Sequence, residues 1–456
     1  MIFNREQTEI FESIENDTES LVVEARAGTG KTTTGVEACN LVDSNKTVSF
    51  VAFNKSIAEE LKWKVASNVK AMTSHSMGYR SLLYTHKGIK VDENKCRIIF
   101  RSLGYPRDLE GPTLQLVSLA KTSDTDYPDF PYLVEHFDLN IEADELSNVT
   151  GMAATVLEES LRRMDVIDLD DMVYLPALGR SKLYPVDYLF IDEAQDMNAA
   201  QLAMFRRAMK FDSRLIAIGD RNQSIYGFRG ADSEAIPRII ADFDAKRLPL
   251  STCYRCAAKI IEQAQKIVPE IQARPGAPDG EVVNIQMHDM YRQAKSSDLI
   301  LCRVNAPLVA TALTFIANGV KAQVLGTDIG RSVALLVDKV VKRYHVDDVK
   351  NFVKVLGFYE NDERQKLIAA EKISLANALQ DKVATLMVIC MNAKSIQHIY
   401  DIINTIFSDN IYGVTLSSVH KAKGKEADNV FILKPELLPH PNARGWQVQQ
   451  EMNLKY

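Results

Sequence analysis

The stretch from Leu21 to Thr32, LVVEARAGTGKT, constrains the fold more than any other part of the sequence. Its apolar start predicts a short buried strand, and Lys31 opens a predicted helix. The spacing is that of G-x-x-x-x-G-K-T, with Ala25 at the first glycine. In such a loop the backbone N–H groups surround a polyphosphate, the lysine reaches its outer phosphates and the threonine hydroxyl can bind Mg²⁺. The predicted nucleotide-binding residues are Ala25, Arg26, Ala27, Gly28, Thr29, Gly30, Lys31, Thr32 and Thr33.

The length and composition are those of an ordinary globular protein. A chain of 456 residues is too long for one core, so we expect about two to four domains. There is no apolar run of about eighteen residues and no signal-peptide pattern, so we expect a cytoplasmic, nucleic-acid-associated protein without a membrane partner. The net charge of −6 does not exclude nucleic-acid binding, because a local groove can still be basic. The pair Cys253 and Cys256 lacks a second pair of metal ligands at suitable spacing, which favours core thiols over a metal site.

Four further apolar stretches end in polar clusters. They run over residues 47–53, 69–72, 188–191 and 215–218. In a parallel sheet with helical crossovers, functional groups gather outside the carboxyl ends of the strands. The pattern therefore predicts one shared crevice.

Two segments break this pattern. Residues 79–164 predict helices interrupted by proline and glycine, and residues 331–410 again predict only helices. A second α/β unit is expected to begin near residue 246, with a strand at 298–302 and the pattern resuming at 414 and 430. The predicted organisation is a first domain at 1–78 and 165–245 with an insertion at 79–164, and a second domain at 246–330 and 411–456 with an insertion at 331–410.

Asp192 and Glu193 follow the apolar run YLFI. An aspartate at a strand end can hold Mg²⁺ on a nucleotide, and a neighbouring glutamate can activate the attacking water. Because a phosphate loop lies upstream, the pair indicates a nucleoside triphosphatase rather than a solvated acidic turn. Protein kinase chemistry is disfavoured, since no H-R-D or D-F-G set is present.

Residues 219–231, GDRNQSIYGFRGA, place an amide, two aromatic rings and an arginine just after another predicted strand. Gln223 could sense the γ-phosphate while Tyr226 and Phe228 stack on unpaired bases, which would couple hydrolysis to a nucleic-acid strand. Taken alone, the two rings could equally belong to the core.

The order and residue content of these motifs resemble the superfamily 1 helicases of the UvrD/Rep/PcrA type. The FNKS stretch at residues 53–56 most resembles the F-box helicase branch and its phage relatives. The resemblance covers nearly the whole chain except the two insertions. It implies two RecA-like α/β domains with parallel sheets flanked by helices, each with a mainly helical insertion. It also implies that ATP and Mg²⁺ bind in the cleft between them.

The resemblance assigns roles to residues beyond the phosphate loop. Thr32 and Asp192 would hold Mg²⁺. The remaining ATP-site positions are Gln7 for adenine, Glu193 as general base, Gln223 as γ-phosphate sensor, Tyr254 over the adenine, Arg255 on the γ-phosphate, and Gly424 with Glu426 near the ribose. Tyr254, Arg255 and Glu426 are expected on the wall opposite Lys31. Lys425 stands where leucine is usual in the family.

The resemblance also implies a set of DNA-binding residues. These are Phe53, Asn54, Lys55, His75, Ser76, Tyr226, Phe228, Arg229, Arg303, Asn305, Ser418, His420 and Lys421. The last three are expected to face either DNA or the interface between the domains.

The implied activity is that of an ATP-dependent translocase and helicase moving 3′ to 5′ on single-stranded DNA. We expect a monomer that acts at single-strand/double-strand junctions alongside replication, repair or recombination proteins. Two alternatives stay open, a protein-displacing translocase with little unwinding and an ATP-gated nucleic-acid-binding scaffold, and RNA is a possible substrate. The final residues, QEMNLKY, resemble the start of the last helicase motif, so we expect either a trimmed chain or one that lacks that motif's arginine.

Overall fold

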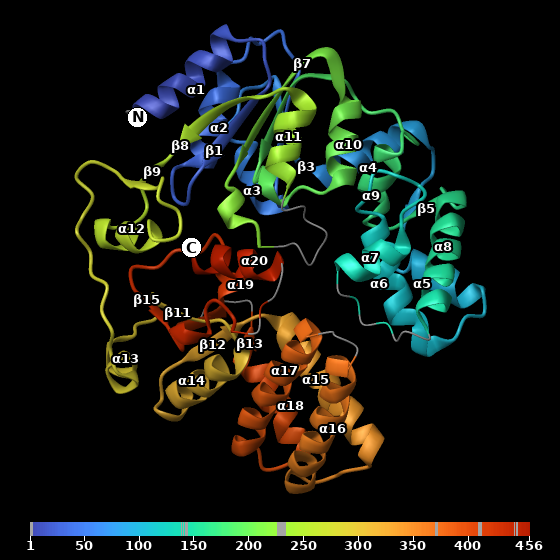
Figure 1. Ribbon diagram of the computed structural model, residues 1–456, viewed down its shortest axis with the longest axis vertical. Coiled ribbons are helices and arrows are strands. Elements are labelled where there is room, and N and C mark those ends of the chain that lie inside the picture. Colours follow the sequence, from blue (N-terminus) through green and yellow to red (C-terminus); the bar gives the residue numbers. More distant parts are fainter. Residues whose placement is uncertain are drawn as a thin grey trace. The chain divides into compact units, whose positions relative to one another are not determined.

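The structure of the chain is a computed structural model that describes residues 3–137, 139, 141, 145–225, 234–369, 373–408, 413–441, 443 and 446–456. The chain divides into two compact units, residues 1–282 with Tyr456 and residues 283–455. Each unit contains a parallel sheet flanked by helices, as the sequence predicts (Figure 1). Over the described ranges, no helix has the length and apolar character needed to cross a bilayer.

The first unit is built on a six-stranded sheet in the order β3-β2-β6-β7-β1-β8, in which every neighbouring pair is parallel. The strands are β1 (Leu21–Ala25), β2 (Val48–Ala52), β3 (Val69–Thr73), β6 (Val186–Asp192), β7 (Met209–Gly219) and β8 (Lys246–Leu250). The four predicted apolar stretches are β2, β3, β6 and β7, which confirms that they belong to one sheet. The carboxyl ends of all six strands therefore share one edge.

Helices cover both faces of this sheet, so its inner strands have no solvent face. Along β1, Val22 packs into one apolar cluster and Val23 into another, because successive side chains of a strand point to opposite faces. The helices that follow or precede the strands are α1 (Arg5–Asn16), α2 (Lys31–Asn40), α3 (Lys55–Leu61), α4 (Ser74–Thr85), α10 (Ala199–Ala208) and α11 (Ala235–Phe243).

The expected start of a second α/β unit near residue 246 is wrong. β8 pairs with β1 from Leu21 opposite Lys246 to Ala25 opposite Leu250, so it is an edge strand of the first sheet. The first unit then continues to residue 282. This continuation carries β9 (Thr252–Cys253), α12 (Ala258–Ala264) and β10 (Gln272–Ala273).

The segment between β3 and β6 is mainly helical and has its own apolar cluster. Its helices are α5 (Lys95–Ser102), η1 (Arg107–Leu109), α6 (Glu110–Ala120), α7 (Phe130–His136), α8 (Leu146–Arg162) and α9 (Asp171–Ala177). Two short strands, β4 (Lys90–Val91) and β5 (Val166–Ile167), pair in parallel within it. Two-residue strands are too short to leave a periodic pattern, which is why only helices were predicted here.

The second unit holds a five-stranded parallel sheet in the order β13-β12-β14-β11-β15. Its strands are β11 (Leu299–Cys302), β12 (Ala322–Leu325), β13 (Phe407–Ser408), β14 (Val414–Ser418) and β15 (Val430–Ile432). Its helices are α13 (Met287–Gln293), α14 (Asn305–Ala317), α15 (Thr327–Tyr344), α16 (Val349–Ala369), α17 (Ile373–Asn392), α18 (Ile396–Ile406), α19 (Val419–Ala422) and α20 (Trp446–Lys455), with a 3-10 turn η5 (Pro435–Leu437).

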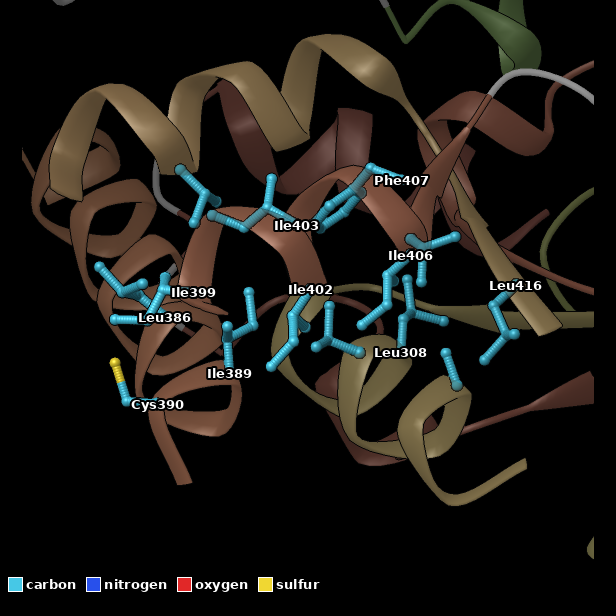
Figure 2. Packing of buried hydrophobic residues seen from close by; sticks show 14 of the residues in the cluster. Leu308, Leu386, Ile389, Cys390, Ile399, Ile402, Ile403, Ile406, Phe407 and Leu416 are labelled. Carbon is cyan, nitrogen blue, oxygen red and sulfur yellow. The ribbon is translucent and has the colours of Figure 1, made fainter. Parts of the chain in front are cut away.

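The helical segment of the second unit shares its core with the sheet. Figure 2 shows Ile402 and Ile406 of α18 in line with Leu308 of α14 and Leu416 of β14, and all four belong to one buried cluster. This cluster continues into α15, α16 and α17. The α15–α18 segment is thus packed as part of one unit rather than around a separate core.

Candidate functional site

The predicted phosphate loop joins β1 to α2. Gly28 and Gly30 adopt the left-handed backbone region, with φ of +67° and +80°. Residues that carry a side chain rarely adopt this conformation. Gly30 is the N-cap of α2 and uses no side chain for capping, so the first N–H groups of that helix have no side-chain acceptor there. Inside the loop the Thr29 hydroxyl donates a hydrogen bond to the Arg26 carbonyl at 2.8 Å. The loop therefore has the backbone of an anion-binding turn at a helix N-terminus.

The side chains with the expected phosphate and Mg²⁺ roles lie together. The Thr32 hydroxyl donates to the Asp192 carboxylate at 2.8 Å, and the Lys31 ammonium lies 3.8 Å from Glu193. Asp192 is fully buried at the end of β6, and its burial, with Glu193 beside it, raises its pKa to about 6. Hard divalent cations prefer oxygen ligands, so the hydroxyl and carboxylate oxygens fit the Mg²⁺ that accompanies a nucleotide.

Glu193, the candidate general base, is held in a strained position. Its backbone φ of 53° and ψ of 44° lie in the left-handed region, which costs a residue other than glycine about 1–3 kcal/mol. The carboxylate accepts a hydrogen bond from the side-chain amide of Gln195, which lies in the turn η2 (Ala194–Asp196). Backbone strain of this kind persists only where neighbouring contacts fix it, and Gln195 supplies one.

Two polar residues of this network were not predicted as site residues. Gln195 accepts a hydrogen bond from the backbone N–H of Asp220 at 2.9 Å, and Asp220 in turn accepts one from the Gln223 amide at 2.7 Å. Burial raises the pKa of Asp220, which Lys31 and Gln223 partly oppose. Gln195 stands two residues after Glu193, and Asp220 stands in the GDRNQ stretch three residues before Gln223, so their position beside the assigned residues was the available signal.

Tyr254 and Arg255 do not lie where the resemblance placed them. They belong to the first unit, beside the phosphate loop, rather than to a second domain. The Tyr254 N–H donates to the Gly28 carbonyl at 2.8 Å, and a Cβ at Gly28 would lie 2.8 Å from the Arg255 Cβ. The reason is that β8 extends the first sheet, so the chain leaves its end directly over the loop.

Gln7, the expected adenine-recognising residue, is buried in α1 and its amide has protein partners. The side-chain nitrogen donates to the Thr34 hydroxyl at 3.0 Å, and the oxygen accepts from the Asn4 N–H at 3.0 Å in a capping box. Thr34 lies in α2, so Gln7 ties the N-terminal helix to the helix that follows the phosphate loop.

The expected DNA-binding residues of the first unit lie on neighbouring strand ends. Phe53, Asn54 and Lys55 follow β2, His75 and Ser76 follow β3, and all five are exposed. These two strands are adjacent and parallel, so both groups sit on the same sheet edge as the phosphate loop. The remaining three positions of this unit, at 226, 228 and 229, lie outside the described residues.

In the second unit the expected residues also meet at strand ends. Cys302 pairs with Ser418, which places Arg303 next to the start of α19. The Arg303 guanidinium donates to both Glu451 oxygens at 2.9 Å. Burial and the nearby Arg303 charge lower the pKa of His420 to about 4, while Glu451 opposes this.

The structure also places four other expected residues of the second unit. Asn305 donates from its backbone N–H at 2.8 Å and from its side chain at 2.7 Å to Asp381. Lys421 pairs with Asp328. Gly424, with a φ of +81°, and Glu426 are both exposed.

Comparison with known proteins agrees with this geometry. The family model of the UvrD/REP helicase N-terminal domain matches residues 3–244, more than half of the chain. Relatives include "ATP-dependent DNA helicase PcrA" of Staphylococcus epidermidis, 23% identical over 84% of this chain and 58% of the relative. They also include "Probable DNA helicase II homolog" of Mycoplasma pneumoniae, 25% identical over 57% and 41%, and "ATP-dependent DNA helicase Rep" of Buchnera aphidicola, 29% identical over 24% and 18%. This chain thus spans about half the length, or less, of these relatives, and it belongs to the UvrD/REP helicase family.

Proposed function

We propose that this chain is an ATP-dependent DNA helicase whose ATP site lies at the carboxyl edge of the first sheet. The observation that carries the proposal is the joining of the phosphate loop to Asp192 and Glu193, through the 2.8 Å bond from Thr32 and the 3.8 Å approach of Lys31. A phosphate loop alone indicates nucleotide binding, whereas this set adds the carboxylate that can hold Mg²⁺ and the candidate base for the attacking water. The names of the relatives support the same activity.

In the proposed reaction each side chain has a defined task. The loop N–H groups and Lys31 bind the phosphates, and Thr32 with Asp192 would hold Mg²⁺, which neutralises phosphate charge when bound. Glu193 would accept the proton of the attacking water. Gln195 keeps that carboxylate in position.

The nucleic-acid track is proposed on the same edge of the sheet. Phe53 and His75 offer exposed rings, and Lys55 offers a cation, at the ends of neighbouring strands β2 and β3. Rings stack on unpaired bases and lysine pairs with phosphate, so this edge suits single-stranded DNA. Following the family resemblance, we further propose that the chain moves 3′ to 5′ along this strand and separates duplex DNA.

The test is ATP turnover by the full chain with and without a single-stranded DNA oligonucleotide. We expect DNA to stimulate turnover, and Glu193→Gln to lower it by about 10²–10⁴-fold while nucleotide still binds. Glu158→Gln, on the exposed face of α8, is the matched control and should behave as wild type. Turnover that survives Glu193→Gln would refute the assignment of the base.

Direction and unwinding need a second assay. Duplexes with a 3′ or a 5′ single-stranded tail should be separated only when the tail is 3′. An oligonucleotide of RNA in place of DNA tests the choice of nucleic acid. Removal of a tightly bound protein from the tail without duplex separation would favour a protein-displacing translocase, and binding without turnover would favour a scaffold.

A further inference from the structure

Cys253 and Cys256 flank the Tyr254–Arg255 pair on the segment that crosses the phosphate loop. Cys253 ends β9 and is fully buried in a small apolar cluster with Ile261. Cys256 lies three residues on, packs against the same cluster and is partly exposed. All six cysteines of the chain are reduced in this structure.

The Cys253 sulfur is packed directly on the phosphate loop. A Cβ placed on Gly28 would lie only 2.7 Å from that sulfur and 2.8 Å from the Arg255 Cβ, so there is no space for a methyl group between loop and segment. The 2.8 Å hydrogen bond from the Tyr254 N–H to the Gly28 carbonyl fastens the same contact. Any shift of the cysteine segment therefore changes its contact with the phosphate loop.

The Cys256 side chain acts on the Cys253 thiol, which differs from the buried thiols elsewhere in the chain. The Cys256 thiol donates a hydrogen bond to the Cys253 sulfur, and backbone N–H groups add to it, which lowers the pKa of Cys253 to about 6 against the effect of burial. By contrast, burial raises the pKa of Cys39 and of Cys390 to about 12. Thiolates are the nucleophilic form of cysteine, so the buried Cys253 sulfur can attack Cys256 once Cys256 carries a mixed disulfide.

We propose that Cys253 and Cys256 form a reversible disulfide that weakens nucleotide binding at the phosphate loop, with a small-molecule disulfide as the oxidant. This switch rests on the proposed ATP site. An S–S bond is about 2.05 Å long, so the two sulfurs must move closer together than in the reduced pair for the bond to close. Because the Cys253 sulfur packs directly against Gly28, moving that sulfur to close the bond changes the contact between the segment and the loop.

The chemistry proceeds by thiol–disulfide exchange. First the partly exposed Cys256 thiol gives its proton to water, and its sulfur attacks one sulfur of the small disulfide, releasing one thiolate. The Cys253 thiolate then attacks the Cys256 sulfur, closes the intramolecular bond and releases the second thiolate. Two protein thiols are oxidised and one small disulfide is reduced to two thiols, which take up two protons.

The test treats the full chain with glutathione disulfide, removes the reagent and measures two quantities. Mass spectrometry after alkylation should show that two thiols are lost and that a peptide links positions 253 and 256. Titration with a fluorescent ATP analogue should show at least tenfold weaker binding, restored by dithiothreitol. Cys256→Ser should bind the analogue normally and resist the oxidant, whereas Cys96→Ser should respond as wild type.

The two measurements separate the possible failures. Six free thiols after treatment, or loss of thiols elsewhere, would overturn the disulfide. A disulfide at 253–256 with unchanged analogue binding would overturn the switch. A reduced chain that does not bind the analogue would refute the proposed function, and the thiol count would still decide whether the disulfide forms.

Discussion

A buried ion cluster in the helical segment between β3 and β6 allows the cost of one substitution to be worked out. Its members are Lys95, Lys121, Asp168 and Asp171, each at most 8% exposed. The Lys121 ammonium lies 2.6 Å from Asp168 and 2.8 Å from Asp171, and Lys95 lies 2.6 Å from Asp171. Two positive and two negative charges therefore balance in the interior.

Replacing Lys121 by methionine keeps most of the side-chain volume and removes one of these charges. A carboxylate is then left buried without its partner, which costs about 3–5 kcal/mol. At about 2.1 cal/mol/K per residue, the unfolding entropy of residues 1–282 is about 0.6 kcal/mol/K, so the melting temperature of the first unit should fall by about 5–8 °C. Differential scanning calorimetry of the full chain measures this fall.

The stability deficit of Lys121→Met is the free energy of unfolding that it loses relative to wild type. The pH dependence of this deficit tests its cause. Burial pushes the pKa of Asp168 up, but Lys121 outweighs burial, and the pKa lies below its ordinary value. Such a carboxylate stabilises the fold above its unfolded pKa of about 3.9 and loses that contribution as the pH falls. The orphaned carboxylate of Lys121→Met takes up a proton more readily, so the deficit should shrink between pH 7 and pH 4.

Two results would refute this reasoning about Lys121. One is a deficit below about 1 kcal/mol at pH 7, and the other is a deficit that keeps its size down to pH 4. Lys62→Met is the matched control, because Lys62 is exposed and pairs with Glu59 only at the surface. It should leave the melting temperature unchanged.

Further predictions concern helix packing and one histidine. A Cβ on Gly78 would lie 1.7 Å from the Met172 carbonyl oxygen, so Gly78→Ala must separate α4 from α9. This variant should lower the free energy of unfolding by about 1–3 kcal/mol or more. Gly151→Ala, in open space on α8, should instead raise it by about 0.5–1 kcal/mol. Thermal unfolding of the pair compares them, and equal effects would contradict the close approach. The pKa of His420 in the folded chain is lowered to about 4, chiefly by burial. As the pH falls, the unfolded chain therefore binds a proton at this histidine before the folded chain does. The free energy of unfolding of the second unit should fall by about 2 kcal/mol between pH 7 and pH 5. Urea unfolding at both pH values should show a smaller loss in His420→Gln, and an equal loss would exclude this residue as the cause.

How far the sequence predicts the fold depends on how each strand is buried. β2 and β6 have helices on both faces, so they appear in the sequence as apolar runs and were predicted. β8 is an edge strand with the sequence KRLPL, in which Lys246, Arg247 and Pro249 are exposed. Proline and charge are tolerated at a sheet edge, so no apolar run marks this strand. The boundary near residue 246, and with it the placement of Tyr254 and Arg255, was wrong for that reason.

The contacts that join the motifs were beyond prediction because they depend on strand register. Asp192 lies opposite Ile218 in the β6–β7 pair, which sets the turn after β6 beside the turn after β7. Gly219 is required there, since a Cβ at this position would lie 2.6 Å from the Gln195 side-chain oxygen. The Gln195 amide can then donate to Glu193 and accept from the Asp220 N–H at once. The buried Gln195 amide thus connects the candidate base to the strand end that carries the candidate phosphate sensor, through its bonds to Glu193 and to the Asp220 N–H.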